Sequence, residues 1–173
     1  MNLNLGSSNP KGKYKDPIWV NFDYCKMDGV QVRGSAVELP FRDNSFDLIE
    51  SVHCAEHLSR DKTLPMLAEC LRTLKPGSKL MLEVPDFEQV VYLLADAYKR
   101  KDSAAIHIWK TSCFGKSERK YMSHLTGFDE TQLHSYLNQV GFTSVKRLVF
   151  EEDMISRHYL QEPILLFEAY KGV

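Results

Sequence analysis

Two residues near the start of the chain have the types and spacing of a nucleoside-binding site. Gly6 follows a short apolar segment at residues 3–5, and Asp23 ends the next apolar segment at residues 18–23. A glycine lets the backbone approach a ligand closely, and a carboxylate can accept hydrogen bonds from both hydroxyls of a ribose. A loop glycine is more often just a turn residue, so this pair needs support from other parts of the sequence.

A second group of chemically capable residues is the segment His53-Cys54-Ala55-Glu56-His57. It matches the H-x-x-E-H signature of inverted zincins, in which two histidines on one helix face bind zinc and the glutamate acts as base. The chain is short for a peptidase and no third ligand is evident, so we expect no metal site. His53 is also the first candidate for a general base, because its ordinary pKa suits proton transfer. A purely structural histidine would fit the same position.

The elements that must position these residues are short strands alternating with amphipathic helices. Strands are expected at residues 3–5, 18–23, 30–32, 46–52, 79–84, 144–150 and 164–170. Helical spacing of apolar residues predicts helices over 61–74, ended by Pro76-Gly77, over 87–98, and between Asp129 as N-cap and Gly141 as stop. This order predicts one α/β domain over residues 1–173, with a mostly parallel sheet whose strands bind the ligand at their carboxyl ends.

The composition is that of an ordinary globular chain. Its 173 residues are 43% hydrophobic, with 22 basic and 23 acidic side chains. The balanced charge argues against a nucleic-acid binder that relies on bulk electrostatics, and the hydrophobic content argues against disorder. No apolar run approaches the ~20 residues of a membrane span, and the first residues lack a signal-peptide layout. The four cysteines form no C-x-x-C pair, which favours reduced thiols and a cytoplasmic location.

Three segments in order carry a family resemblance: residues 38–49 (ELPFRDNSFDLI), 53–58 (HCAEHL) and 71–77 (LRTLKPG). They resemble the class I, seven-stranded S-adenosylmethionine-dependent methyltransferases, with the closest similarity to the type 11 branch. The resemblance runs from about Leu3 to Phe142. It implies a Rossmann-like sheet of seven strands with helices on both faces, and S-adenosylmethionine as cofactor.

The resemblance also implies roles for individual residues. Gly6 and Ser7 would line the loop around the methionine part of the cofactor, and Asp23 would hold the ribose. Ser35 and Ala36 would lie along the adenine edge. Ser51, Val52 and His53 would face the sulfonium and the acceptor. His124 lies in a segment where family members place acceptor-side residues, and it is the second catalytic candidate.

Three departures from the family pattern bear on function. Gly6 is followed by Ser7-Ser8 rather than by further glycines, and Ser35 stands where an aspartate is usual. Pro10, Gly12 and Pro17 prevent the usual first helix over residues 9–17, so this helix is expected to be reduced or absent. One face of the sheet would then lack a helix, and we consider a homo-oligomer formed through that face as a hypothesis.

These observations favour a methyltransferase acting on an unidentified acceptor. The segment 110–120 carries a local excess of three positive charges, which could receive an anionic acceptor, although such charge runs are more often solvated loops. The departures above favour an alternative, a non-catalytic relative that has become a binding or assembly subunit. A zinc peptidase is the third function considered.

Overall fold

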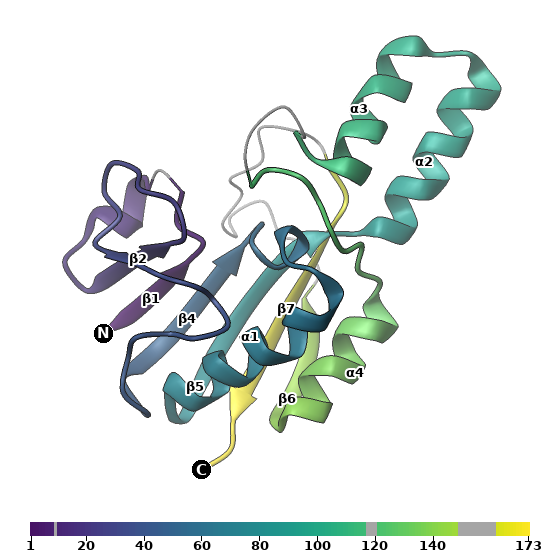
Figure 1. Ribbon diagram of the computed structural model, residues 1–173. Coiled ribbons are helices and arrows are strands. Elements are labelled where there is room, and N and C mark those ends of the chain that lie inside the picture. The colour runs from purple at the N-terminus through teal and green to yellow at the C-terminus, as the bar shows by residue number, and fades with distance from the viewer. Residues whose placement is uncertain (9, 117–120, 149–161) are drawn as a thin grey trace.

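The computed structural model describes residues 1–8, 10–116, 121–148 and 162–173. Its centre is one seven-stranded sheet with the strand order β3-β2-β1-β4-β5-β7-β6 (Figure 1). Strands β1 to β5 pair in parallel, and β7 runs antiparallel to both β5 and β6. The expected seven-stranded, mostly parallel sheet is confirmed. The strands are β1 (Asn2–Leu5), β2 (Trp19–Asp23), β3 (Val32–Arg33), β4 (Phe46–Val52), β5 (Leu74–Pro85), β6 (Phe142–Leu148) and β7 (Ile164–Lys171).

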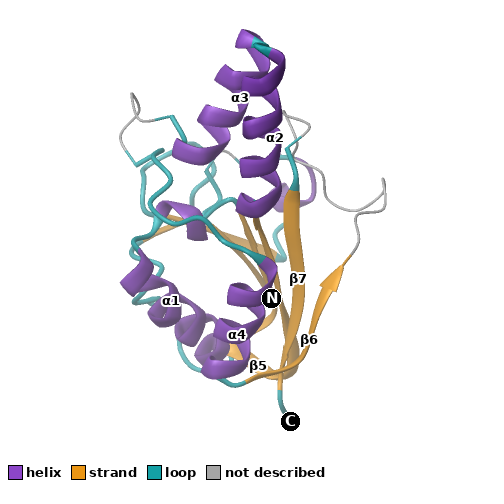
Figure 2. Cartoon of the chain, turned by 90° about the vertical axis from the view of Figure 1, so that its right-hand side faces the viewer, coloured by secondary structure: helices purple, strands orange, loops and turns teal. Residues whose placement is uncertain are grey.

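Helices α1 (Arg60–Thr73) and α4 (Glu130–Val140) cover one face of this sheet (Figure 2). Their apolar side chains enter a core with the alternate residues of the strands, because successive strand residues point to opposite faces. From the helices the core takes Met66, Leu67, Cys70, Leu133 and Leu137, all fully buried. This layer fixes the sheet as a rigid platform for the carboxyl edge.

The ends of α4 follow the sequence signals. Asp129 accepts a hydrogen bond from the backbone N–H of Gln132 at 2.8 Å, and Gly141 ends the helix in the left-handed conformation with φ +110°. Phe128, the residue before the cap, is buried in the same core as Leu133. The predicted cap and stop are both present.

On the other face of the sheet, the connection from β1 to β2 is the short 3₁₀ helix η1 (Gly12–Lys15), as expected from its prolines and glycine. Tyr14 is buried there and donates its hydroxyl hydrogen to Glu50 Oε2 at 2.5 Å. Lys13 Nζ donates to the other oxygen of Glu50 at 2.8 Å, and Asn21 donates to the carbonyl of Tyr14. A polar network therefore covers this part of the sheet, where the family usually has a helix.

Several boundaries differ from the predictions. Strand β5 begins at Leu74 rather than at 79, and β3 covers Val32–Arg33 rather than residues 30–32. Helix α1 ends at Thr73, three residues before Pro76, because Leu74 already pairs with Phe46 as the first residue of β5. Strand β6 begins at Phe142 rather than at 144, and residues 149–150 lie outside the described part of the chain. At Leu74 of β5 and Phe142 of β6, the sheet extends to residues that are buried in the core.

A helical hairpin projects beyond the carboxyl edge of the sheet in both views (Figures 1 and 2). It consists of α2 (Phe87–Arg100), which was predicted, and α3 (Ser103–Phe114), which was not. The apolar residues of α3 do not gather in one stripe, and the only residue it buries is the polar Ser112. None of the described helices is long and apolar enough to cross a bilayer.

Candidate functional site

The strand order places the carboxyl ends of β1, β2 and β4 side by side, and a cavity of about 420 Å³ opens there. We call it the inner cavity. One side is the strand wall, formed by residues 5–8, 22–27 and 34–36. The other side is the histidine wall, formed by residues 53–58 and 121–125. The position is the one at which open parallel sheets bind ligands.

Gly6 forms the turn at the end of β1, and no other residue type fits there. Its φ is +76°, and a Cβ at this position would lie 2.6 Å from both Cβ and Sγ of Cys54. The backbone N–H groups of Gly6 and Ser7 both donate to the carbonyl of Phe22 at 2.9 Å. The turn thus keeps the backbone close to β4 and leaves the cavity open above it.

Asp23 ends β2 with a carboxylate held in one orientation. Its Oδ2 accepts from the backbone N–H of Ser8 and its Oδ1 from that of Cys25, both at 2.8 Å. Each oxygen keeps further acceptor capacity, and the side chain lines the inner cavity. This arrangement can accept the two hydroxyl hydrogens of a ribose.

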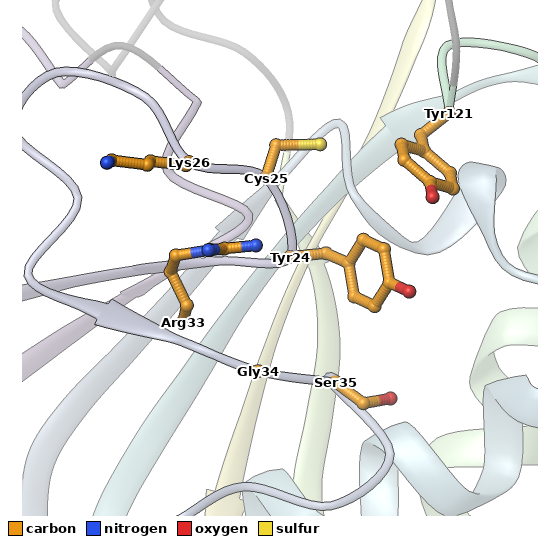
Figure 3. A pocket seen from close by; sticks show the side chains of 7 residues that line it. All are labelled: Tyr24, Cys25, Lys26, Arg33, Gly34, Ser35 and Tyr121. Atoms are coloured by element: carbon orange, nitrogen blue, oxygen red, sulfur yellow. The ribbon is translucent and has the colours of Figure 1, made fainter.

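Ser35 and Ala36 lie on the same strand wall, as the resemblance implies. Ser35 also borders an outer cavity of about 630 Å³, which shares Tyr24, Cys25, Gly34 and Tyr121 with the inner one. Figure 3 shows Tyr24 and Tyr121 on one side of the outer cavity and the cationic Lys26 and Arg33 on the other. The rings of Tyr24 and Tyr121 meet edge to face, with 5.0 Å between their centroids.

Three of the predicted cofactor residues lie beneath the site. Ser7, Ser51 and Val52 are buried and are absent from the lining of the inner cavity. Sequence reasoning singled out His124 from the acceptor-side segment, whereas the residues of that segment that line the cavity include Tyr121, Met122 and Leu125. The Cys54 thiol also lines the cavity, but burial raises its pKa to about 12, so it is a neutral thiol.

His53 leaves β4 with φ +48° and projects from the histidine wall. Its Nδ1 lies 3.0 Å from Glu56 Oε1, and its Nε2 lies 3.4 Å from Glu83 Oε1. Burial lowers the pKa of His53, but the hydrogen bond and charge of Glu56 and the charges of Glu83 and Glu162 outweigh it and raise the pKa to about 9. At neutral pH the imidazole is therefore a cation between two carboxylates. Glu83, an acid inside an apolar strand segment, is the partner that sequence reasoning missed.

The two segments of the histidine wall are joined by contacts between residues far apart in the sequence. The backbone N–H groups of Leu125 and Thr126 both donate to the carbonyl of Glu56, and Thr126 Oγ1 donates to the carbonyl of Leu58 at 2.8 Å. His57 Nδ1 lies 3.0 Å from the carbonyl oxygen of Ser123. His124, the second catalytic candidate, lies behind the wall and packs its ring on that of His57 at 5.0 Å between centroids.

The zinc-peptidase arrangement is not formed. Residues Ala55–His57 make one turn of 3₁₀ helix, η2, instead of the α-helix that would place His53 and His57 on one face. His53 is engaged by Glu56 and Glu83, so Glu56 is an ion-pair partner and cannot serve as the base of an H-x-x-E-H site. The H-x-x-E-H pattern is present in the sequence, but the structure does not give its residues the arrangement of a zinc peptidase.

Comparison with known proteins agrees with this geometry. Residues 14–82 match the family described as a methyltransferase domain. A protein of Encephalitozoon cuniculi, whose name classes it as a candidate methyltransferase, is 39% identical over 92 residues, which cover 47% of this chain and 43% of that protein. The chain spans less than half the length of the curated relatives it matches.

Solved structures share the fold over nearly the whole chain. A methyltransferase of Thermotoga maritima, dependent on S-adenosylmethionine, covers 99% of this chain and 82% of its own, with a TM-score of 0.63 and 20% identity. The phosphoethanolamine N-methyltransferase 2 of Haemonchus contortus, solved with S-adenosylmethionine bound, has a TM-score of 0.62 and 14% identity, over 99% of this chain and 48% of that one. Such low identities show the fold alone. The chain is therefore similar to a methyltransferase domain over residues 14–82, and it shares the fold of the S-adenosylmethionine-dependent methyltransferases over nearly its whole length.

Proposed function

We propose that this chain binds S-adenosylmethionine in the inner cavity and transfers its methyl group to an acceptor at the histidine wall. The observation that carries the proposal is the pairing of Gly6 and Asp23 at one cavity, where the glycine keeps the turn open and the carboxylate is preset by two backbone N–H groups. When bound, the cofactor supplies an activated methyl group on a sulfonium. The chain must then hold acceptor and methyl group in line.

The strand wall would hold the cofactor. Asp23 would accept from the ribose hydroxyls, and Ser35 and Ala36 would lie beside the adenine. Tyr24 follows Asp23 and lines both cavities, so its ring offers a flat face for a purine to stack on. The resemblance implies the roles of Asp23, Ser35 and Ala36, and the position of each side chain on the cavity lining supports them.

The protonation state of His53 limits the class of acceptor. A histidine with a pKa of about 9 is protonated at neutral pH and cannot accept a proton from the acceptor. We therefore infer an acceptor that is already unprotonated and nucleophilic at neutral pH, such as a weakly basic amine or a thiolate of low pKa, rather than a hydroxyl that must first be deprotonated. The role of His53 as general base stays a prediction for pH values above its pKa.

Further expectations stay proposals of the same kind. An anionic acceptor is supported by the basic side chains near the site, which include Lys26 and Arg33 on the outer cavity. A homo-oligomer through the sheet face without its first helix is testable by sedimentation, although Tyr14 and Lys13 already cover part of that face. A cytoplasmic location is supported by the four cysteines, which are all free thiols.

Calorimetric titration with S-adenosylhomocysteine tests the cofactor site. We expect a dissociation constant on the order of micromolar for the wild type and binding weakened by about 100-fold for Asp23→Asn, because a charge-assisted hydrogen bond is lost. The matched control is Asp28→Asn, an exposed aspartate in the same loop that does not line the cavity. No binding at about 1 mM ligand would contradict the proposal and favour the non-catalytic alternative.

Transfer of a labelled methyl group to matched amine and alcohol acceptors tests the acceptor class. With the reaction run at pH 7.5, we expect label on amines or thiols and none on the corresponding alcohols. Label on alcohols alone would show that a base other than the charged His53 serves the reaction.

A further inference from the structure

A second group of side chains meets at the histidine wall: His57 lines the inner cavity, whereas Glu56 and His124 lie behind it. Glu56 and His57 come from η2 and its end, and His124 comes from the segment that pairs with them. One carboxylate oxygen of Glu56 and one ring nitrogen of each histidine lie within 4.8 Å of one another. The three residues are close in space although His124 lies far from the other two in the sequence.

The protonation of both imidazoles follows from their partners. Nδ1 of His57 lies 3.0 Å from the carbonyl oxygen of Ser123, and Nδ1 of His124 lies 2.8 Å from that of Ser112. A carbonyl oxygen can only accept, so each Nδ1 carries the hydrogen. In the neutral form of each ring, Nε2 then has the lone pair that a metal ion can bind. A backbone carbonyl on the far nitrogen is also the usual support of a metal-binding histidine.

The carboxylate of Glu56 adds a third acceptor. The residue is 1% exposed; its Oε1 pairs with His53, and its Oε2 is buried without a hydrogen-bond partner among the described residues. A buried carboxylate oxygen without a donor is costly, and two imidazole lone pairs beside it supply no hydrogen. With both rings neutral, the cluster offers three acceptor atoms; His53 pairs with Oε1 of Glu56, and Oε2 has no hydrogen donor among the described residues.

Space for a single ion adjoins the cluster. A small cavity of about 10 Å³ is lined by Glu56 and His124 together with Ser112, Cys113 and Thr126, and His57 lies beside it, within 4.8 Å of both. This volume is close to that of one water-sized sphere and excludes any larger ligand. The Ser112 hydroxyl is also buried without a hydrogen-bond partner in the described part of the chain.

We propose that Glu56, His57 and His124 bind one divalent transition-metal ion of the zinc type. Two neutral imidazoles and one carboxylate form a donor set that zinc accepts, whereas Mg²⁺ and Ca²⁺ require oxygen ligands. The ion would tie residues 121–126 to residues 54–58, and so would fix the histidine wall. This role is structural, and the proposal holds whether or not the chain transfers methyl groups.

Zinc titration of the metal-free full chain, in competition with a chromophoric chelator, tests the proposal. We expect one equivalent to bind with a dissociation constant on the order of micromolar or lower, and His124→Gln or Glu56→Gln to weaken it by about 100-fold. His107→Gln is the matched control, because this histidine is exposed on α3. Its zinc affinity should equal that of the wild type.

Two further measurements keep the test decisive if a variant folds poorly. Co²⁺ bound to the wild type should give the visible absorption of a site with nitrogen and oxygen ligands, without the strong charge-transfer band of a thiolate. Zinc should raise the melting temperature of the wild type and leave that of His124→Gln unchanged. No zinc binding at about 0.1 mM, a thiolate band, or equal affinity in all variants would overturn the proposal.

Discussion

The two walls of the inner cavity are built in different ways. The strand wall consists of the turn after β1, the end of β2 and the segment after β3, and its key contacts join residues close in the chain, such as Asp23 with Ser8 and Cys25. The histidine wall joins residues 53–58 to residues 121–126 through contacts that span more than sixty positions, such as His57 with Ser123. Contacts between residues close in sequence hold the strand wall, whereas contacts between residues far apart in sequence hold the histidine wall.

The two walls are therefore suited to different roles in the site. The strand wall presents a fixed turn and an oriented carboxylate, which suit a cofactor common to a whole family. The histidine wall depends on a cluster of charged and polar side chains and on a segment beside the α2–α3 hairpin, so it can vary without disturbing the strand wall. We expect substitutions in the two walls to have separable effects.

The largest effect is expected at the turn of the strand wall. Gly6→Ala should lower the free energy of unfolding by about 3 kcal/mol, because the new methyl group meets Cys54 at 2.6 Å and the residue must keep φ at +76°. Gly12→Ala is the control: its φ is +56° and nothing lies within 4 Å, so we expect a loss of about 1 kcal/mol. Equal losses in urea denaturation would show that the close approach to β4 does not matter.

The next effect is the pH dependence of the histidine wall. The pKa of His53 is raised in the folded protein, from 6.5 to about 9, so its stabilising contribution is complete below pH 6.5 and is lost as the pH rises through 9. In chelator-treated protein we expect the wild type to lose stability on the order of 2 kcal/mol more than His53→Gln between pH 6 and pH 9.5. The groups that face His53 are Glu56, Glu83 and Glu162. A constant difference between the two proteins across this range would contradict the assignment.

A smaller effect is expected where the histidine wall is joined. Thr126→Val removes the hydroxyl that donates to the carbonyl of Leu58 at 2.8 Å, and should cost about 1 to 2 kcal/mol of stability. Cofactor affinity should not change, since Thr126 is no part of the strand wall. Thr111→Val removes a similar bond to the carbonyl of His107 on the more exposed α3, and should cost less than about 0.5 kcal/mol. Weaker S-adenosylhomocysteine binding in Thr126→Val would mean that the walls are coupled.

The smallest effect is expected for ligand affinity when Ser35 of the strand wall is replaced. Ser35→Asp restores the acceptor that the family usually has beside the adenine, and should tighten S-adenosylhomocysteine binding about 2- to 10-fold. The gain should vanish for S-inosylhomocysteine, which lacks the amino group, and Ser35→Ala should leave the affinity nearly unchanged. The same gain for both ligands would place the adenine elsewhere.

The strand wall could be predicted from the sequence, because its signals are local. Each signal can be recognised within a few residues: a glycine after one strand, an acid at the end of the next, and a proline-rich connection that cannot form a helix. Asp129 and Gly141 likewise mark the ends of α4 where the structure has them. The alternation of strands and helices likewise predicted a mostly parallel sheet, but not the strand order or the antiparallel β7 between β5 and β6.

The histidine wall could not be predicted in this way. The sequence pattern grouped His53 with Glu56 and His57 as zinc ligands, but the chain turns at His53 with a positive φ and pairs it with Glu83 from the neighbouring strand β5. The residue that does join Glu56 and His57 is His124, and only the fold of the distant segment brings it there. Helix α3 was not predicted, because its apolar residues do not gather on one face of the helix.

The most direct test of the two-wall account is a map of backbone amide shifts in a ¹⁵N-labelled chain titrated with S-adenosylhomocysteine. We predict the largest shifts at Gly6, Ser8, Asp23, Tyr24 and Ala36, smaller ones at residues 53–58, and none in α4. Saturating shifts confined to this pattern would establish the strand wall as the cofactor site. Absence of shifts at about 1 mM ligand, or shifts centred on another surface, would contradict it.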